Sequence, residues 1–186
     1  MLRVFIFGAE NDQSLVPNYT HKSRQGYAEP LHQTGNTFRI RATARMTSSA
    51  VESVLDVALW FQDRARYENE HLQAQKLQRL LFIAQGQYAI QFYGRKLMPA
   101  TFVAYEVGPL EPNIMRFFEF GPPNIPTLDP PAELEEFLER LWRKFGHYSA
   151  DKLGEIARAH PAYKVAAKKG KGEEVPFGAI AKGSTE

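Results

Sequence analysis

The segment that decides the fold is Gln75-Lys76-Leu77-Gln78-Arg79-Leu80-Leu81-Phe82-Ile83-Ala84-Gln85-Gly86. Within it and just beyond it, apolar residues recur at steps of three and four, the spacing of one helix face. These residues are Leu77, Leu80, Leu81, Ala84, Tyr88 and Phe92. Gly94 follows at the place where helices commonly end on a glycine. The spacing therefore predicts a helix from about Leu72 to Phe92.

Amphipathic segments on both sides of this helix predict further helices. Ser49 and Glu52 form a capping-box pattern ahead of a helix from about Ala50 to Tyr67. Three more helices are expected downstream: a short one from Pro112 to about Gly121, one from about Pro130 to Phe145 capped by Asp129, and one that begins at Ser149 and runs through Ala157, with Pro161 marking its end or the start of another.

Between the helices, the hydrophobic period shortens to the alternation typical of a strand. Residues 101–107, Thr-Phe-Val-Ala-Tyr-Glu-Val, alternate, and Gly108-Pro109 is expected to form a turn. The fold class predicted is mainly α: a compact multi-helix domain with a short β-strand or hairpin insertion, α+β at the margin.

The two ends of the chain differ from this domain in composition. Residues 9–45 show neither helical nor strand periodicity, so we expect residues 1–45 to be a disordered or mis-annotated extension, with Met46 as the true initiator. Residues 168–174 are polar and glycine-rich, which predicts a flexible tail over 168–186. The helical domain is then expected to span residues 46–167.

Composition and charge limit the classes of function. The chain has 186 residues and no cysteine, which suits a reducing, cytoplasmic location, and no apolar stretch is expected to cross a membrane. Residues 1–45 carry six Lys/Arg against three Asp/Glu, which leaves 17 against 18 in the rest of the chain, a net charge of −1. Nucleic-acid binding, which usually needs a basic excess, is therefore a second choice.

No motif for catalysis, cofactor or metal binding stands out in the sequence. Gly170 and Gly172 do not follow a strand and open a helix as a phosphate loop requires, and the five histidines lack metal-ligand spacing. Ser49, Ser53 and Ser149 occupy helix-capping contexts. We expect no enzyme, cofactor or metal; the catalytic alternative would use His160 with a carboxylate.

Aromatic residues are too numerous for one helical stripe to bury. They are Trp60, Phe61, Tyr88, Phe92, Tyr93, Phe102, Tyr105, Phe117, Phe118 and Phe120. Core packing accounts for most of them, but some should be exposed, and exposed aromatic side chains are common in protein-binding hot spots. Protein binding is thus the first choice of function.

Several short sequence motifs, which follow one another in the family's order along the chain, resemble the Panacea family of antitoxin domains. The run 75–86 is similar to the family's signature helix, 93–97 to its glycine turn, 104–112 to its Gly-Pro block, and 149–153 with 159–161 to its closing segment. Tyr105 and Tyr163 depart from the pattern, because the family tends to have tryptophan there. The resemblance covers about Met46 to Ala166.

The resemblance implies an antitoxin that binds a cognate toxin protein and acts as a proteolytic adaptor, delivering the toxin to the ClpX/ClpXP protease. The segment Val175–Ala181 is a candidate for the protease contact. The alternative is a DNA-binding transcriptional regulator of its own operon. By the family pattern, the residues expected to bind protein are Lys76, Gln78, Gln85, Tyr105, Gly108, Pro109 and His160.

Overall fold

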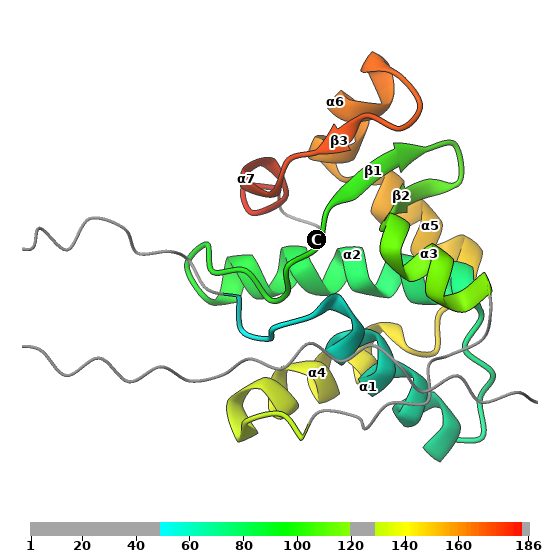
Figure 1. Ribbon diagram of the computed structural model, residues 1–186, viewed down its shortest axis with the longest axis vertical. Coiled ribbons are helices and arrows are strands. Elements are labelled where there is room, and N and C mark those ends of the chain that lie inside the picture. Colours follow the sequence, from blue (N-terminus) through cyan, green and yellow to red (C-terminus); the bar gives the residue numbers. More distant parts are fainter. Residues whose placement is uncertain (1–48, 120–128, 184–186) are drawn as a thin grey trace, which may run out of the picture. The chain divides into compact units, whose positions relative to one another are not determined.

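The computed structural model (Figure 1) describes residues 49–119 and 129–183. They belong to one compact unit, Ala42–Glu186. The expectations for residues 1–45 and for a helix end near Gly121 fall outside the described residues. None of the helices in the described ranges has the length and apolar content that a membrane span requires.

Seven helices and three strands make up the described part of the chain. In order they are α1 (Val54–Tyr67), α2 (Ala74–Gln91), β1 (Phe102–Tyr105), β2 (Gly108–Leu110), α3 (Pro112–Glu119), α4 (Ala132–Phe145), α5 (Ala150–Ala159), α6 (Pro161–Lys169), β3 (Glu174–Val175) and α7 (Phe177–Ile180). The predicted class, mainly α with a small β insertion, is confirmed.

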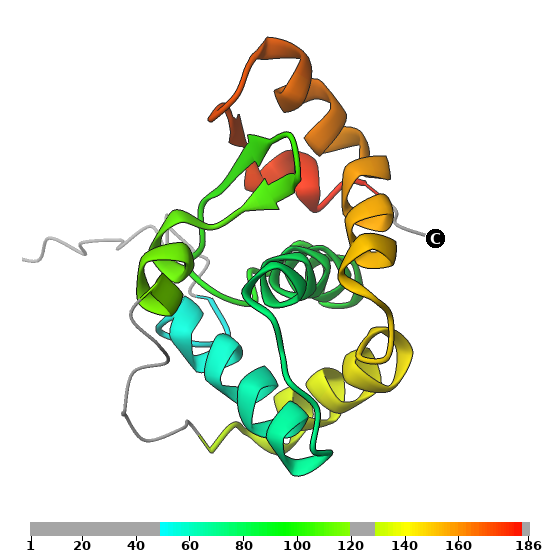
Figure 2. The ribbon, with the colours of Figure 1, turned by 90° about the vertical axis from the view of Figure 1, so that its right-hand side faces the viewer.

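Helix α2 lies at the centre of these elements (Figure 2). Its residues from Leu77 to Gly86 are all buried, so every face of the helix is covered. It contacts α1, α3, α4, α5, α7 and β2. In both views the small sheet lies on one side of α2, and α1 and α4 lie on the opposite side.

The sheet is antiparallel with strand order β2-β1-β3. Tyr105 pairs with Gly108 across the hairpin, so the turn is formed by Glu106 and Val107. The prediction of a turn at Gly108-Pro109 was wrong by two residues, because both residues belong to β2. Gly108 has a φ of 122°, a backbone conformation that favours glycine at this edge of the turn.

The start of α1 also differs from the prediction. The capping box is formed by Ser53 and Asp56, whose side chains accept from the backbone N–H groups of Leu55 and Ser53 at 3.1 and 2.9 Å. The predicted pair, Ser49 and Glu52, lies ahead of the helix. Helix α4 begins at Ala132 after Pro131 and has no side-chain cap, so the predicted cap at Asp129 is also wrong. Ser149 does cap α5 as predicted.

The C-terminal segment through Gly183 is folded onto the domain, in contrast to the predicted flexible tail. Val175 pairs with Phe102 in the sheet, and Val175 and Ile180 are both buried. Helix α7 contacts α2 and α6. The domain boundary expected near residue 167 therefore lies further along the chain.

Candidate protein-binding site

Two residues of the family pattern lie away from the β1–β2 hairpin: Lys76 stands beside Glu70 and Trp142, and Gln85 binds Met98 in the loop before β1. The others come from α2, from the hairpin, and from the junction of α5 with α6. These elements contact one another directly, since α2 packs against both β2 and α5, and α5 packs against β2. The hairpin thus contacts segments that lie far apart in the sequence.

Gln78 lies inside this region and fixes the segment that follows β2. Its side-chain amide donates to the Glu111 carbonyl at 3.0 Å and accepts from the Glu111 N–H at 2.7 Å. The buried Glu111 carboxylate accepts in turn from the Ile114 N–H at 2.8 Å, at the first turn of α3. Gln78 therefore positions α3 and does not offer its amide to a partner.

Gln85 has the same kind of role further along α2. Its fully buried amide accepts from the Met98 N–H and donates to the Met98 carbonyl, both at 3.2 Å. These two bonds hold the loop before β1 against the central helix. The structure thus places both glutamines in the interior, where they satisfy backbone groups that water cannot reach.

We expect Gln85→Ala to lower the free energy of unfolding by about 3 kcal/mol, because two buried backbone groups of Met98 lose their partners. Urea denaturation followed by circular dichroism would measure this. Gln91→Ala, an exposed position on the same helix, serves as the control and should change stability by less than about 0.5 kcal/mol. Equal stabilities for the two variants would contradict the assigned role of Gln85.

Tyr105 and Pro109 also act within the fold. The Tyr105 carbonyl accepts a hydrogen bond from the Tyr163 hydroxyl on α6, so the two tyrosines that depart from the family pattern are partners. Pro109 is buried in β2, while Tyr105 is half-buried beneath Lys171, whose ammonium lies 5.3 Å from the ring centre. Of these residues, only Tyr105 presents side-chain surface near the hairpin.

Lys76 belongs to a charged cluster at the beginning of α2. Its ammonium lies 3.4 Å from Glu70 and 5.8 Å from the centre of the Trp142 ring. Glu68, Glu70 and His147 bring their ligand atoms within 4.8 Å of one another, a spacing that a metal ion could use. However, Arg64 pairs with Glu68 at 2.8 Å, so both carboxylates already have cationic partners. The arrangement is that of an ion-pair network.

Hydrogen bonding holds the Glu68 carboxylate in its ionised form within this network. The Trp142 Nε1–H donates to Glu68 at 3.0 Å and, together with the Arg64 guanidinium, lowers the pKa of Glu68. The network ties the end of α1 to α4, and it accounts for Lys76 as a residue that supports the fold.

His160 lies at the corner between α5 and α6 and is only 2% exposed. Its Nδ1 accepts from the Ala162 N–H at 3.2 Å, and its ring meets Phe82 edge to face. The C-terminal segment covers the other side, since a Cβ at Gly183 would stand 2.3 Å from the ring. With these contacts on both sides, the His160 ring is packed inside the described part of the fold.

Burial lowers the pKa of His160, and this predicts a loss of stability in mild acid. Below about pH 6.5 the unfolded chain binds a proton on this histidine while the folded ring stays neutral, so stability falls as the pH falls. We expect a decrease of up to about 1.4 kcal/mol per pH unit in that window, measured by urea denaturation between pH 7.5 and 5.5.

His160→Gln should reduce this pH dependence, whereas His71→Gln, which alters an exposed side chain, should leave it unchanged. The same slope in all three proteins would show that protonation of His160 is not involved.

Two arginines at the hairpin turn were not singled out by the sequence patterns. The Arg79 Nη2 donates to the Val107 carbonyl at 2.9 Å, and the Arg158 Nη1 donates to the same oxygen at 3.3 Å. Arg79 is 5% exposed, and within residues 49–119 and 129–183 its Nε and Nη1 have no hydrogen-bond partner. One clue was in the sequence: Arg79 is the one charged residue in the run from Leu77 to Gln85, which otherwise has only apolar and amide side chains.

Next to these arginines, an open groove of about 450 Å³ runs along the hairpin turn. It is lined by Ala74, Gln75, Gln78, Val107, Leu110, Ile114 and Met115. Val107 and Met115 are 50% and 51% exposed, so two apolar side chains at this groove face solvent. We call this groove, with Arg79 and Arg158, the hairpin face.

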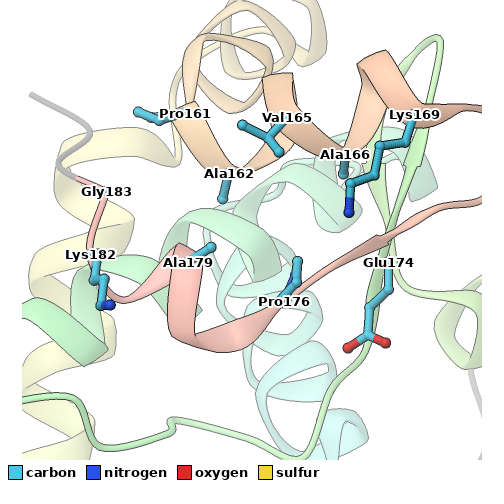
Figure 3. Close-up of a pocket in the computed structure, with 10 residues that line it drawn as sticks. All are labelled: Pro161, Ala162, Val165, Ala166, Lys169, Glu174, Pro176, Ala179, Lys182 and Gly183. Atoms are coloured by element: carbon cyan, nitrogen blue, oxygen red, sulfur yellow. The ribbon is translucent and has the colours of Figure 1, made fainter.

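A second groove, of about 380 Å³, lies between α6 and the β3–α7 segment (Figure 3). Ala162 and Val165 on α6 stand opposite Pro176 and Ala179, with Lys169 and Glu174 toward one end. The groove is built by the segment that was expected to be a tail. None of the described residues that line it is a buried charged side chain like Arg79.

Comparison with protein-family models, with curated proteins and with solved structures finds no match. The resemblance to the Panacea family therefore depends on the short sequence motifs alone. The hairpin face is interpreted from the chemistry of its own side chains. That chemistry consists of exposed apolar side chains and two clustered guanidinium groups, which suits recognition of another polypeptide.

Proposed function

We propose that the protein is an antitoxin that binds a cognate toxin protein through the hairpin face and presents it to the ClpXP protease. The observation that carries the binding part is the hairpin face itself, where Val107 and Met115 are half-exposed beside a groove and two arginines. The antitoxin and adaptor roles are supported by the resemblance of residues 75–86 and 104–112 to the Panacea family.

Physical features of the hairpin face favour a protein partner. Apolar side chains beside a concave surface bury area when a partner docks, and arginine is among the residues most enriched at the centre of such interfaces. Gln78 holds Glu111 just after the hairpin, and Arg79 and Arg158 hold the Val107 carbonyl in its turn. The hairpin therefore has little conformational entropy to lose on binding. A preorganised surface of this kind binds with a small entropic cost.

The proposed contact with ClpXP needs a surface other than a free tail. Val175 and Ile180, within the segment first considered for this contact, are buried in the sheet and against α2. Any protease contact by this part of the chain must therefore use its exposed residues, such as Pro176 or Lys182, or must follow local opening of the segment.

The test is co-expression of the full chain with the neighbouring open reading frame, followed by pull-down and by measurement of the toxin half-life with and without ClpX. A stable complex whose toxin is degraded faster in the presence of ClpX would support the adaptor role. A complex with an unchanged half-life would contradict delivery to the protease and leave masking of the toxin. Failure to form a complex, together with a salt-dependent shift of promoter DNA, would favour the DNA-binding alternative.

A matched pair of variants tests the proposed face. Met115→Asp places a charge in the hairpin groove, and Val165→Asp places one at an equally exposed position on α6, in the second groove. We expect Met115→Asp to weaken toxin capture at least tenfold, in line with truncation effects at interface centres, and Val165→Asp to leave capture unchanged. The opposite pattern would place the toxin in the second groove.

A further inference from the structure

We propose that Arg79 and Arg158 form a carboxylate-binding site at the turn of the β1–β2 hairpin, which takes an acidic group of a bound polypeptide whose neighbouring apolar side chain enters the groove at Val107 and Met115. The inference builds on the proposed function, because it specifies the chemistry by which the hairpin face recognises its partner. It is nevertheless testable without knowledge of the toxin.

The first argument is the unused hydrogen-bonding capacity of a buried cation. Arg79 is only 5% exposed. Of its three guanidinium nitrogens, Nη2 donates to the Val107 carbonyl. Its Nε and Nη1 are buried without an acceptor. Leaving charged donors unpaired away from water is costly, and such positions are rare in folded proteins unless they serve a purpose.

The second argument is the local charge balance. Arg158 donates to the same carbonyl as Arg79, so two positive charges converge on one neutral acceptor. In the part of the chain that the structure describes, no carboxylate lies within ion-pair distance of either guanidinium. Burial and the positive charge of Arg158 lower the pKa of Arg79, while the negative charge of Asp151 acts in the opposite direction. An added carboxylate would relieve this imbalance.

The third argument is that the fold leaves space for the two guanidinium groups. A Cβ at Gly154 would stand 3.0 Å from both the Arg79 Nε and the Arg158 Nη1, so the glycine of α5 lets the guanidinium groups lie against the helix. Arg158 is only half-buried, so a carboxylate that approaches from its solvent side can reach a position next to both cations.

The surroundings favour a single carboxylate over a nucleic-acid backbone. Glu106 in the hairpin turn and Asp151 on α5 are both exposed near the site, and they would repel a row of phosphates. The remaining neighbour is the apolar groove, which shares Val107 with the arginine site. Charge-assisted hydrogen bonds from arginine to a carboxylate, next to an apolar contact, match an acidic residue beside an apolar one in a polypeptide.

The experiment is a titration of the isotopically labelled full chain, followed by NMR signals of the Arg79 Nε–H and of the Val107 and Gly154 amides. The probes are N-acetyl-Leu-Glu-amide, which carries a side-chain carboxylate, N-acetyl-Leu-Gln with a free terminal carboxylate, the neutral N-acetyl-Leu-Gln-amide, and inorganic phosphate. We expect saturable shifts with one or both acidic peptides and none with the neutral peptide. The two acidic probes distinguish a side-chain carboxylate from a chain terminus.

Matched arginine variants assign the effect to the site. Arg158→Gln should weaken binding of the acidic peptide at least tenfold, whereas Arg66→Gln, which alters an exposed arginine on α1, should not change it. A dispersed amide spectrum confirms that each variant is folded. Equal shifts with the neutral peptide, binding of phosphate alone, no saturable shift, or an unchanged affinity in Arg158→Gln would each overturn the proposal.

The outcomes also separate this proposal from the proposed function. Peptide binding without capture of a toxin would keep the carboxylate site and reject the antitoxin role. Toxin capture that is unaffected by Arg158→Gln, with no peptide binding, would keep the antitoxin role and reject the site.

Discussion

Replacement of Trp142 by alanine is expected to lower the free energy of unfolding by about 4 kcal/mol, the range found for large aromatic residues deleted from a core. The side chain is fully buried on α4 and lies 6.1 Å, centre to centre, from the Phe61 ring of α1. Its Nε1–H also donates to Glu68 at 3.0 Å. Urea denaturation followed by circular dichroism would measure the loss. Circular dichroism is preferred to tryptophan fluorescence because the substitution removes one of the two tryptophans.

Two further variants separate packing from hydrogen bonding. Trp142→Phe keeps an aromatic ring but leaves Glu68 without this donor, so we expect a loss of about 1–2 kcal/mol. Arg143→Ala, at the adjacent exposed position, should be close to neutral. A loss below about 1 kcal/mol for Trp142→Ala would show that α4 does not depend on this contact.

Truncation after Glu173 is expected to destabilise the domain by roughly 3–6 kcal/mol, because it removes the fully buried Val175 and Ile180, each contributing about 1.5–3 kcal/mol. It also takes away the strand that pairs with Phe102 and Val103, and the cover of His160. Circular dichroism at increasing urea, together with amide hydrogen exchange of β1, would measure both effects.

The control for the truncation is removal of residues 184–186 alone, which leaves β3 and α7 intact. We expect that shorter deletion to have no measurable effect on urea denaturation. If the truncation after Glu173 were equally silent, the interpretation of this segment as a flexible tail would be correct after all.

Local patterns were sufficient for the helices and insufficient for the contacts between distant segments. The apolar spacing of α2 and α4 located both helices to within about two residues, because such spacing depends on neighbours three and four positions away. Two capping boxes of equal spacing precede α1, Ser49 with Glu52 and Ser53 with Asp56. The second is used because the backbone N–H groups of Ala50 and Val51 donate to the carbonyls of Lys96 and Leu97, which keeps these residues out of the helix.

The C-terminal segment shows the same limit more clearly. Its polar, glycine-rich start predicted a tail, yet β3 is only two residues long and gains its stability from pairing with β1 far earlier in the chain. No local period reveals such a pairing.

The candidate site could be predicted from the sequence only in part. The family pattern named residues of the hairpin, but Gln78, Gln85 and His160 are interior residues that hold backbone groups or pack in the core. Arg79 was missed, because whether a helical arginine is paired or unpaired is decided by what α5 and the hairpin bring to it.

The pairing of β3 with β1 also has a consequence for biosynthesis. Domains fold as the nascent chain leaves the ribosome, N-terminal elements first. Here β1 cannot pair along its second edge until β3 has been synthesised, since Val175 of β3 pairs with Phe102. Ile180, which packs near Gly86 of α2, is synthesised later still. The sheet that carries the hairpin turn is therefore completed only after nearly the whole described chain has been translated, so a ribosome-bound fragment ending before β3 is expected to lack the complete three-stranded sheet.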